Sequence, residues 1–362
     1  MSGRKSLLIV LPSFAVGGMQ RVASLLANEL VTMDVNVTLF SLGKSKNHFF
    51  KLDDRIRVLE SKTKTNSAFI IIRYIRYIIG IKRAVEVSGA KKILIFGKVQ
   101  SALALLALRN RKEDVYISDR ASPLQRDNYH ILLFNWLVFK LIKPYGIIAQ
   151  TSLSAEFQKK VFGSKSRIEV IPNPVKDIIT YDIQRENIVL AVGRMGDHLK
   201  GFDRLIEAWL LVKVPDWKLI IAGGNENDDP VLVQRIRTLG IYDRVQLLDK
   251  VDDVDRLYAE SSIFVIPSRS EGFPNALAEA LCAGLACISF DFIAGPRDMI
   301  TNNINGIIVN DNDVVQLGKE ITNLINDPLR REELGHQAQL LKNKLNLKFI
   351  ATKYLNFIYE TN

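Results

Sequence analysis

Two glutamates eight positions apart, Glu271 and Glu279, frame the segment whose residue types are best suited to chemistry. The segment follows a short apolar run, turns at Gly272 and Pro274, and continues into an Ala- and Leu-rich stretch that predicts a helix. Proline suits the first turn of a helix, and the amides that follow it have no partner inside the helix. Those amides belong to Asn275, Ala276 and Leu277. Unpaired amides at the positive end of a helix dipole favour a bound phosphate group.

The two carboxylates can serve the same ligand. Glu279 lies just over one turn into the predicted helix, where it can accept hydrogen bonds from the hydroxyls of a ribose whose phosphates lie at the helix start. Taken singly, Glu271 also fits an exposed loop carboxylate, and Glu279 fits a solvated helix residue. The succession of strand, turn and helix start favours a nucleotide site over these two separate interpretations.

A second pair of candidate ligands, Arg194 and Lys200, lies on a loop after an apolar run that ends at Gly193. The loop precedes a predicted helix that Asp203 could cap. Two fixed cations in such a place can neutralise a diphosphate while its bond to a sugar breaks. Surface side chains without a ligand are the alternative, which the neighbouring phosphate site makes less favourable.

A glycine pair, Gly17 and Gly18, opens a predicted helix after the first apolar run and lets a ligand approach the backbone closely. The pair is not the GxGxxG fingerprint, and no P-loop is present, so a nicotinamide enzyme and an NTPase are both disfavoured. None of the four histidines is paired at ligand spacing, and Asp228 with Asp229 fits a polar loop better than a cation site. We therefore expect no metal and no cofactor.

Short runs rich in Val, Ile and Leu alternate with stretches of helical spacing along the chain. This alternation predicts parallel sheets covered by helices, the α/β class. The strands expected in the first half cover residues 6–11, 35–42, 91–96, 115–118, 146–150 and 168–171. Those expected in the second half cover residues 187–192, 218–222, 245–248, 263–266, 286–289 and 306–309. Helical segments follow at residues 313–326, 328–344 and 347–359.

The segment Ile171-Pro172-Asn173-Pro174 separates the two sets of strands. Its prolines cannot donate to a sheet ladder, so it is the expected linker. We therefore expect two doubly wound Rossmann-like domains, residues 1–172 and 173–345, with a last helix at about 346–362 that could pack back on the first. Domains of this type facing each other would place the carboxyl ends of both sets of strands around a central cleft.

The formal net charge is +10, and the excess of Lys and Arg is concentrated in the first half. Residues 67–85, which read SAFIIIRYIRYIIGIKRAV, would place isoleucines and arginines on separate faces of a helix. These faces hold Ile72, Ile75 and Ile79 on one side, and Arg73, Arg76 and Arg83 on the other. The run is too short and too charged to span a bilayer, but it suits a helix lying beside anionic headgroups.

Residues 131–143, with Trp136, Phe139 and two lysines, form a second candidate for membrane contact, and ordinary packing is the alternative for both stretches. Nucleic acid is a weaker alternative, since no nucleic-acid module is recognisable. The polar start of the chain lacks a signal-peptide core, and Cys282 and Cys287 are poorly spaced for a disulfide. We expect buried thiols and a cytoplasmic protein held peripherally at the inner face of a membrane.

The string Glu271-Gly272-Phe273-Pro274-Asn275-Ala276-Leu277-Ala278-Glu279 resembles the EX7E motif of glycosyltransferase family 4, retaining enzymes with the GT-B fold. The resemblance extends over nearly the whole chain, through the glycine pair, the Ile-Pro-Asn linker and the loop of Arg194 and Lys200. It implies that this cationic pair binds the donor diphosphate and stabilises the leaving group. It also implies that Glu279 binds the ribose and that Glu271 lies near the donor sugar.

The resemblance assigns further ligand positions as well. Gly18 would lie at the phosphates with the amides of the helix start, and the backbone near Lys250 and Val251 would read the base. Many family members carry a histidine after the fifth strand of the first domain, whereas this chain has Asp119 followed by Arg120. We expect Asp119 to face the donor sugar, with a structural role as the alternative.

Together with these features, the resemblance implies a retaining transfer of a hexose or N-acetylhexosamine from a UDP-sugar to a polyprenyl-diphosphate-linked saccharide, during assembly of a surface polysaccharide such as an O-antigen or capsule. No residue excludes GDP in place of UDP. A nucleotide-sugar epimerase of the same fold and a nucleotide-sugar-binding subunit without turnover are the alternatives.

Overall fold

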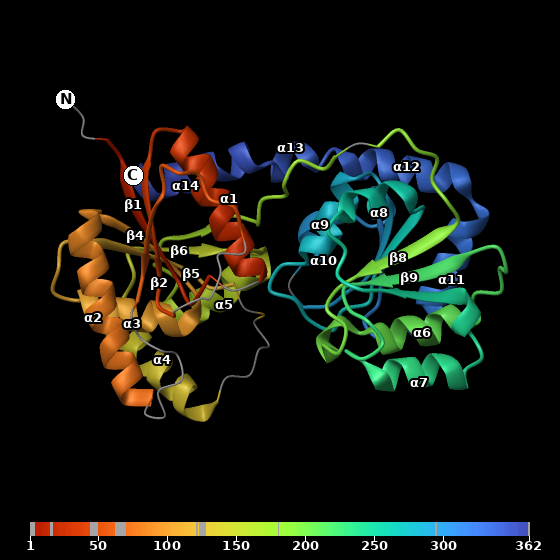
Figure 1. Ribbon diagram of the computed structural model, residues 1–362, viewed down its shortest axis with the longest axis horizontal. Coiled ribbons are helices and arrows are strands. Elements are labelled where there is room, and N and C mark those ends of the chain that lie inside the picture. Colours follow the sequence, from red (N-terminus) through yellow and green to blue (C-terminus); the bar gives the residue numbers. More distant parts are fainter. Residues whose placement is uncertain are drawn as a thin grey trace. The chain divides into compact units, whose positions relative to one another are not determined.

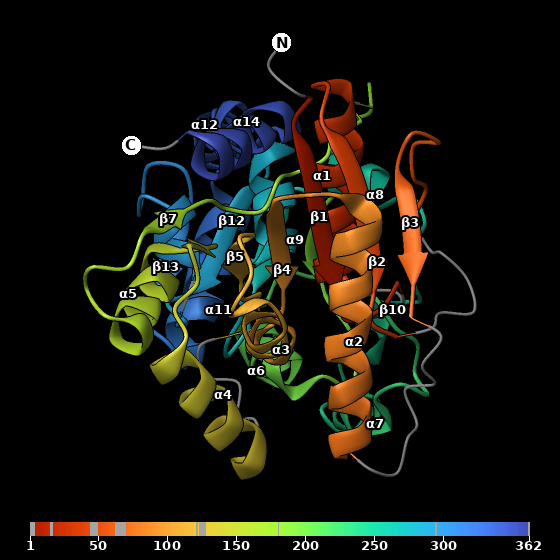
Figure 2. The ribbon, with the colours of Figure 1, turned by 90° about the vertical axis from the view of Figure 1, so that its left-hand side faces the viewer.

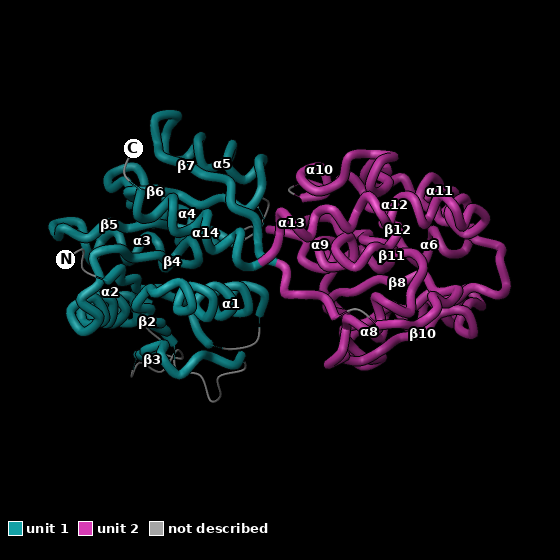
Figure 3. The backbone as a smooth tube through the Cα atoms, turned by 90° about the horizontal axis from the view of Figure 1, so that it is seen from above, with its two compact units in different colours: residues 1–174, 347–362 teal, residues 175–346 magenta. Residues whose placement is uncertain are grey.

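The computed structural model describes residues 4–14, 17–43, 50–61, 70–120, 122, 128–179, 181–293 and 295–360. The chain divides into two compact units (Figures 1 and 3). Unit 1 comprises Met1–Pro174 and Leu347–Asn362, and unit 2 comprises Val175–Asn346. Each unit is built on a parallel sheet covered by helices, so the predicted α/β class with two Rossmann-like domains is confirmed.

Unit 1 contains a sheet of seven parallel strands in the order β3-β2-β1-β4-β5-β6-β7. The strands are β1 (Ser6–Leu11), β2 (Asn36–Ser41), β3 (Arg57–Glu60), β4 (Lys92–Phe96), β5 (Asp114–Ser118), β6 (Gly146–Ala149) and β7 (Ile168–Val170). The helices are α1 (Gly18–Thr32), α2 (Ile70–Ser88), α3 (Lys98–Leu108), α4 (Tyr129–Leu141), α5 (Ser152–Phe162) and α14 (Leu347–Tyr359).

Alternation along β1 divides the core of unit 1 between the two faces of the sheet. Leu7 and Ile9 join the cluster formed with α1 and α14, whereas Leu8 and Val10 join the cluster formed with α2, α3 and α4. Figure 2 shows these last three helices on one face of the sheet. Because both faces are covered, β1 is almost continuously apolar rather than alternating with polar residues.

Unit 2 contains a sheet of six parallel strands in the order β10-β9-β8-β11-β12-β13. The strands are β8 (Ile188–Val192), β9 (Lys218–Ala222), β10 (Val245–Leu248), β11 (Ile263–Ile266), β12 (Ala286–Phe290) and β13 (Ile307–Val309). The helices are α6 (Phe202–Leu211), α7 (Pro230–Thr238), α8 (Val254–Glu260), α9 (Asn275–Cys282), α10 (Pro296–Met299), α11 (Val314–Asn326), α12 (Pro328–Gln339) and α13 (Lys342–Leu345), with 3-10 turns η1 (His198–Lys200) and η2 (Tyr242–Arg244).

Three features differ from the elements expected. Strand β3 was not predicted, because it is a short edge strand with exposed side chains and no apolar run. The helix expected at residues 328–344 is divided into α12 and α13. Of the amphipathic stretch at residues 67–85, residues 67–69 lie outside the described residues, and the remainder belongs to α2. Ile79 lines the same hollow as Arg76 and Arg83, so the expected placing of the isoleucines and these arginines on separate faces is wrong for these three residues.

Candidate active site

The sheet of unit 2 has its topological switch point between β8 and β11, since the strand order reverses there. Ligands of open α/β sheets bind outside the carboxyl ends of the strands at such a point. The segment after β8 carries Arg194 and Lys200, and the segment after β11 carries Glu271. The two sequence motifs therefore meet at the edge where this fold forms ligand sites.

The loop after β8 approaches the end of β11 through Gly201. Its φ is +68°, and a Cβ atom there would lie 2.0 Å from the carbonyl oxygen of Pro267, so only glycine fits. This approach brings Lys200 Nζ within 2.8 Å of Glu271 Oε1. The hydroxyl of Ser268 donates a hydrogen bond of 2.7 Å to the same carboxylate oxygen. The fold therefore brings Lys200, the predicted cation, into an ion pair with Glu271, the first glutamate of the motif.

A second ion pair holds the two loops together. The guanidinium of Arg269 donates to both carboxylate oxygens of Asp203, at 2.7 and 2.6 Å, and its amide donates to the Leu199 carbonyl oxygen at 2.8 Å. The hydrogen bonds from Arg269 lower the pKa of Asp203. Asp203 was expected to cap α6, but the N-cap is Gly201, and Asp203 lies in the first turn, where it binds Arg269 instead.

Helix α9 begins differently from the sequence expectation. Pro274 is the N-cap rather than a first-turn residue, and the amide of Asn275, expected to be unpaired, donates to the Phe273 carbonyl oxygen at 2.9 Å. Within the described residues, the amides of Ala276 and Leu277 have no backbone acceptor. Two of the three expected amides therefore remain available to a phosphate group at the start of α9.

Glu279 lies in the second turn of α9 and is only 6% exposed, so it is not a solvated helix residue. The hydroxyl of Tyr258, from α8, donates to Glu279 Oε2 at 3.1 Å. A carboxylate can accept several hydrogen bonds, so the bond from Tyr258 does not by itself exhaust what Glu279 can accept. Neither Tyr258 nor Ser268 was predicted, because a tyrosine in a short helix and a serine in a loop carry no signal of their own.

The remaining candidate ligands of unit 2 are exposed. Arg194 follows β8 and has no hydrogen-bond or ion-pair partner in the described part of the chain. Val251 lies in the loop after β10 and is 37% exposed. Unlike Lys200 and Glu271, these two residues have no side-chain hydrogen bond or ion pair with the motif among the described residues.

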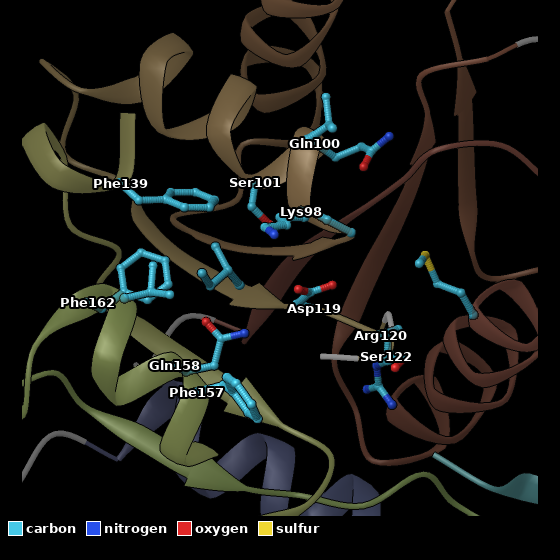
Figure 4. Close-up of a pocket in the computed structure, with 15 residues that line it drawn as sticks. Lys98, Gln100, Ser101, Asp119, Arg120, Ser122, Phe139, Phe157, Gln158 and Phe162 are labelled. Atoms are coloured by element: carbon cyan, nitrogen blue, oxygen red, sulfur yellow. The ribbon is translucent and has the colours of Figure 1, made fainter. Parts of the chain in front are cut away.

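Unit 1 contains the other candidate residues. Gly17 is the N-cap of α1 and Gly18 its first residue. Asp119 follows β5 and lines a cavity of about 420 Å³ at the carboxyl edge of this sheet (Figure 4). Polar side chains of Lys98, Gln100 and Ser101, and aromatic ones of Phe139, Phe157 and Phe162, also line this cavity. Sequence reasoning assigned Asp119 to a ligand site but none of these other residues, which come from three different helices. Phe139 was instead expected in a stretch that contacts a membrane, and that expectation is wrong for this side chain, which is 4% exposed and packs in the core of unit 1.

Arg120 holds the backbone beside Asp119. Its guanidinium donates hydrogen bonds to Asn173 Oδ1 and to the hydroxyl oxygen of Tyr354 in α14, and it lies 4.9 Å from the ring centre of Phe96. Burial lowers the pKa of Arg120. These contacts account for the position of Arg120 and fix the start of the segment that carries Asp119.

No cluster of three or more His, Cys, Asp or Glu side chains suited to a metal ion occurs among the described residues. Asp228 and Asp229 serve the backbone of their loop: Asp228 accepts from the Asn225 amide at 2.9 Å, and Asp229 caps α7 through the Leu232 amide at 3.0 Å. Cys282 and Cys287 are buried free thiols, and burial raises the pKa of Cys282 to about 12.

Comparison with known families places these observations in a class. Residues 180–341, which span most of unit 2, match the family described as glycosyl transferases group 1. An uncharacterized glycosyltransferase of Haemophilus influenzae is 26% identical, over 94% of this chain and 96% of its own length. Unit 2 is therefore a glycosyl transferases group 1 domain.

A second relative is more specific. It is the GalNAc-alpha-(1->4)-GalNAc-alpha-(1->3)-diNAcBac-PP-undecaprenol alpha-1,4-N-acetyl-D-galactosaminyltransferase of Campylobacter jejuni, 25% identical over 95% of each chain. Among solved structures, Anabaena HepE in complex with UDP and glucose matches with a TM-score of 0.80 at 15% identity, over 99% of this chain and 100% of the other. Such a likeness establishes the fold, which is the GT-B fold expected. Of the helices described, none has the length and apolar character needed to cross a bilayer.

Proposed function

We propose that this chain is a retaining glycosyltransferase of family 4, which transfers a hexose or N-acetylhexosamine from a UDP-sugar to a polyprenyl-diphosphate-linked saccharide during assembly of a surface polysaccharide. It would act in the cytoplasm, bound peripherally to the inner face of the membrane. The contact between Lys200 and Glu271 carries the proposal, because it joins two motifs 71 positions apart at the switch point of unit 2.

Each group has a distinct task in this proposal. Lys200 and Arg194 neutralise the diphosphate as its bond to the anomeric carbon breaks, and the amides of Ala276 and Leu277 bind phosphate oxygens. Glu279 accepts hydrogen bonds from the ribose hydroxyls. The acceptor hydroxyl then replaces the diphosphate at the anomeric carbon, with retention of configuration.

Other residues complete the proposal. Glu271 is assigned to the donor sugar, and Asp119 is a second carboxylate assigned to that sugar. The remaining donor contacts are assigned to Gly17, Gly18 and Val251. A uridine nucleotide is supported by the HepE structure, which contains UDP, and a polyprenyl-diphosphate acceptor by the name of the Campylobacter relative.

Exposed apolar residues of α2 and α4 support docking on a membrane. Ile71 and Ile79 of α2 are 69% and 60% exposed, and Trp136 of α4 is 54% exposed. The rings of Tyr74 and Phe134 are 5.2 Å apart, which places the two helices in contact. Aliphatic and indole side chains on adjoining helices with nearby Lys and Arg suit the headgroup region of an anionic membrane.

The decisive experiment incubates the protein with a panel of UDP-sugars, with and without lipid-linked saccharides extracted from membranes. Transfer to the lipid fraction that requires this acceptor supports the proposal. Conversion of the donor sugar without acceptor would establish an epimerase instead, and donor binding without turnover a binding subunit. Lys200→Ala is the test variant, and Lys319→Ala, at an exposed lysine of α11, is its matched control.

A further inference from the structure

A second hollow of unit 1, which we call the α2–β3 groove, lies apart from the candidate active site. Its volume is about 520 Å³, and it is bounded by α2 and by residues of β2 and β3. Its apolar lining residues are Phe40, Leu59, Ile79, Ala84 and Val87. A lining of this kind is suited to a hydrocarbon chain rather than to a sugar or a base, which need several polar partners.

Arginine side chains border this apolar lining. Arg57 of β3 and Arg76 and Arg83 of α2 line the groove with one carboxylate, Glu60, so positive charge predominates. Arg57 donates a hydrogen bond of 2.8 Å to the Val87 carbonyl oxygen. Arg76 and Arg83 are exposed and have no hydrogen-bond or ion-pair partner among the described residues. Two unpaired guanidinium groups beside an apolar trough can bind a phosphate group.

Helical spacing places the two arginines of α2 that line the groove on one side of the helix. Arg76, Gly80 and Arg83 follow one another at intervals of four and three residues, so they share a side of α2. At Gly80 a Cβ atom would lie 3.1 Å from Phe40 Cζ, so the absence of a side chain lets α2 lie close over the groove floor.

The groove also adjoins the face of α2 assigned above to the membrane. Ile79 lines the groove and is 60% exposed, and Ile75, one turn earlier, is 52% exposed. A lipid could therefore enter the groove sideways from the bilayer surface without leaving the headgroup region. A soluble nucleotide or sugar phosphate has no apolar chain that the isoleucines at this opening could contact.

We propose that the α2–β3 groove binds one anionic phospholipid, with its phosphate on Arg76 and Arg83 and one acyl chain along Phe40, Leu59 and Val87. This inference rests on the membrane docking proposed above and names its partner. Binding at a discrete site would hold unit 1 in a defined orientation on the membrane, which a diffuse basic surface alone would not do.

The test uses the full chain and a short-chain phosphatidylglycerol below its micelle concentration, with binding followed by calorimetry. Saturable binding is expected, whereas the matching phosphatidylcholine and inorganic phosphate should bind at least about tenfold more weakly. Arg76→Gln combined with Arg83→Gln should weaken phosphatidylglycerol binding by about tenfold or more. Lys82→Gln, on the same helix but outside the groove lining, is the control and should change affinity less than about twofold.

A groove-filling variant separates the site from general membrane affinity. Val87→Trp places an indole in the trough, so it should reduce phosphatidylglycerol binding while increasing the apolar surface of the protein. Equal binding of the two phospholipids, or unchanged affinity in the arginine and tryptophan variants, would overturn the proposal. Tighter binding of farnesyl diphosphate than of phosphatidylglycerol would also overturn it and assign the groove to the acceptor chain.

The assay contains neither donor nor acceptor, so its failure leaves the proposed transfer intact. Sedimentation with phosphatidylcholine vesicles, with and without phosphatidylglycerol, tests docking separately. The wild-type chain and the groove variants could sediment equally well with the anionic vesicles. That result would contradict the lipid site in the groove but would support membrane docking.

Discussion

Lys200 and Glu271 form a contact between two side chains of unit 2. Their side chains are 24% and 13% exposed, and the distance between Nζ and Oε1 is 2.8 Å. A lysine loses considerable rotamer freedom when it is fixed, and here that loss accompanies folding rather than ligand binding. The Lys200 ammonium group is therefore held at the start of the motif. A bound diphosphate can replace the Glu271 carboxylate as its ion-pair partner there.

Replacement of either cation should impair catalysis more than folding. Lys200→Ala and Arg194→Ala should each lower turnover on the order of a hundredfold or more, because positive charge at the departing diphosphate is lost. The measurement is kcat with UDP-sugar and lipid acceptor, with thermal unfolding as the check on folding. Near-wild-type turnover in a well-folded Lys200→Ala would remove the assignment, and Lys319→Ala should behave like wild type.

Asp119 lines the cavity of unit 1 at the end of β5, a position from which a carboxylate can hydrogen-bond a sugar hydroxyl or balance positive charge at the anomeric carbon. We expect Asp119→Asn to bind donor normally but to turn over far more slowly. Donor affinity and kcat should be measured together, with the exposed Asp54→Asn as control. Full activity with a lowered melting temperature would instead leave Asp119 a structural role.

At the scale of single residues, the sequence predicted the site residues that belong to a motif. It did not predict most of the residues elsewhere in the chain that contact them. The positions of Glu271 and Glu279 follow from local spacing, because a turn and a helix start order their own residues. The contacts of Ser268 and Tyr258 depend on loop closure and on packing of α8 against α9. The bond from Asn275 to the Phe273 carbonyl oxygen reflects a tight turn that the proline alone does not reveal.

The pair of Asp203 and Arg269 links α6 to the loop after β11 and should make unit 2 sensitive to acid. Because Arg269 lowers the pKa of Asp203, the pair stabilises the folded state above the unfolded pKa of about 3.9, and this contribution is lost as pH falls through the lower folded value. Asp203→Asn should destabilise unit 2 by about 1 kcal/mol near neutral pH, since both side chains are partly exposed.

The difference between Asp203→Asn and wild type should shrink as the pH is lowered below about 4. Urea unfolding at several pH values measures it. A difference that stays constant down to the acid limit would show that the pair does not titrate as described.

Arg185 joins the ends of two helices of the site. Its guanidinium donates to the carbonyl oxygens of Tyr258 and Ser261 at the end of α8, and to those of Ala283 and Gly284 after α9. Arg185→Met should lower the free energy of unfolding by about 2–4 kcal/mol, because these carbonyl groups lose a charged donor.

The urea midpoint of unit 2 measures the effect of Arg185→Met. Arg237→Met, which removes an exposed ion pair with Glu226, is the matched control and should cost less than about 1 kcal/mol. Equal shifts in the two variants would contradict a bridging role for Arg185.

At the scale of elements, buried strands were predicted because both of their faces are covered and their sequences are continuously apolar. Strand β3 was not predicted, because backbone pairing with β2 holds it in the sheet while its side chains remain exposed. The helix α14 was predicted from its own pattern, and packing against the first domain was expected only as a possibility, without the surface that it contacts. The amphipathic pattern of a helix indicates that one of its faces is buried. It does not indicate which element covers that face, which here is α1 and depends on the rest of the fold.

Across the whole molecule, turnover should persist in excess EDTA. Two cations and the amides at the start of α9 supply the positive charge that a divalent metal would bring to a departing diphosphate. Initial rates with EDTA, and with added magnesium or manganese, provide the measurement. Complete loss of activity in EDTA, restored by either metal, would show that a metal site forms when the substrates bind.

The return of α14 to unit 1 has a consequence for biosynthesis. Residues 347–362 follow unit 2 in the chain, yet Ile350, Tyr354 and Ile358 of α14 are buried in the core of unit 1. During translation, unit 2 can therefore complete its core while unit 1 still lacks a helix, although domains generally mature in the order of synthesis. A nascent unit 1 must expose the apolar surface of α1 that α14 later covers, and chaperones bind apolar surface of this kind.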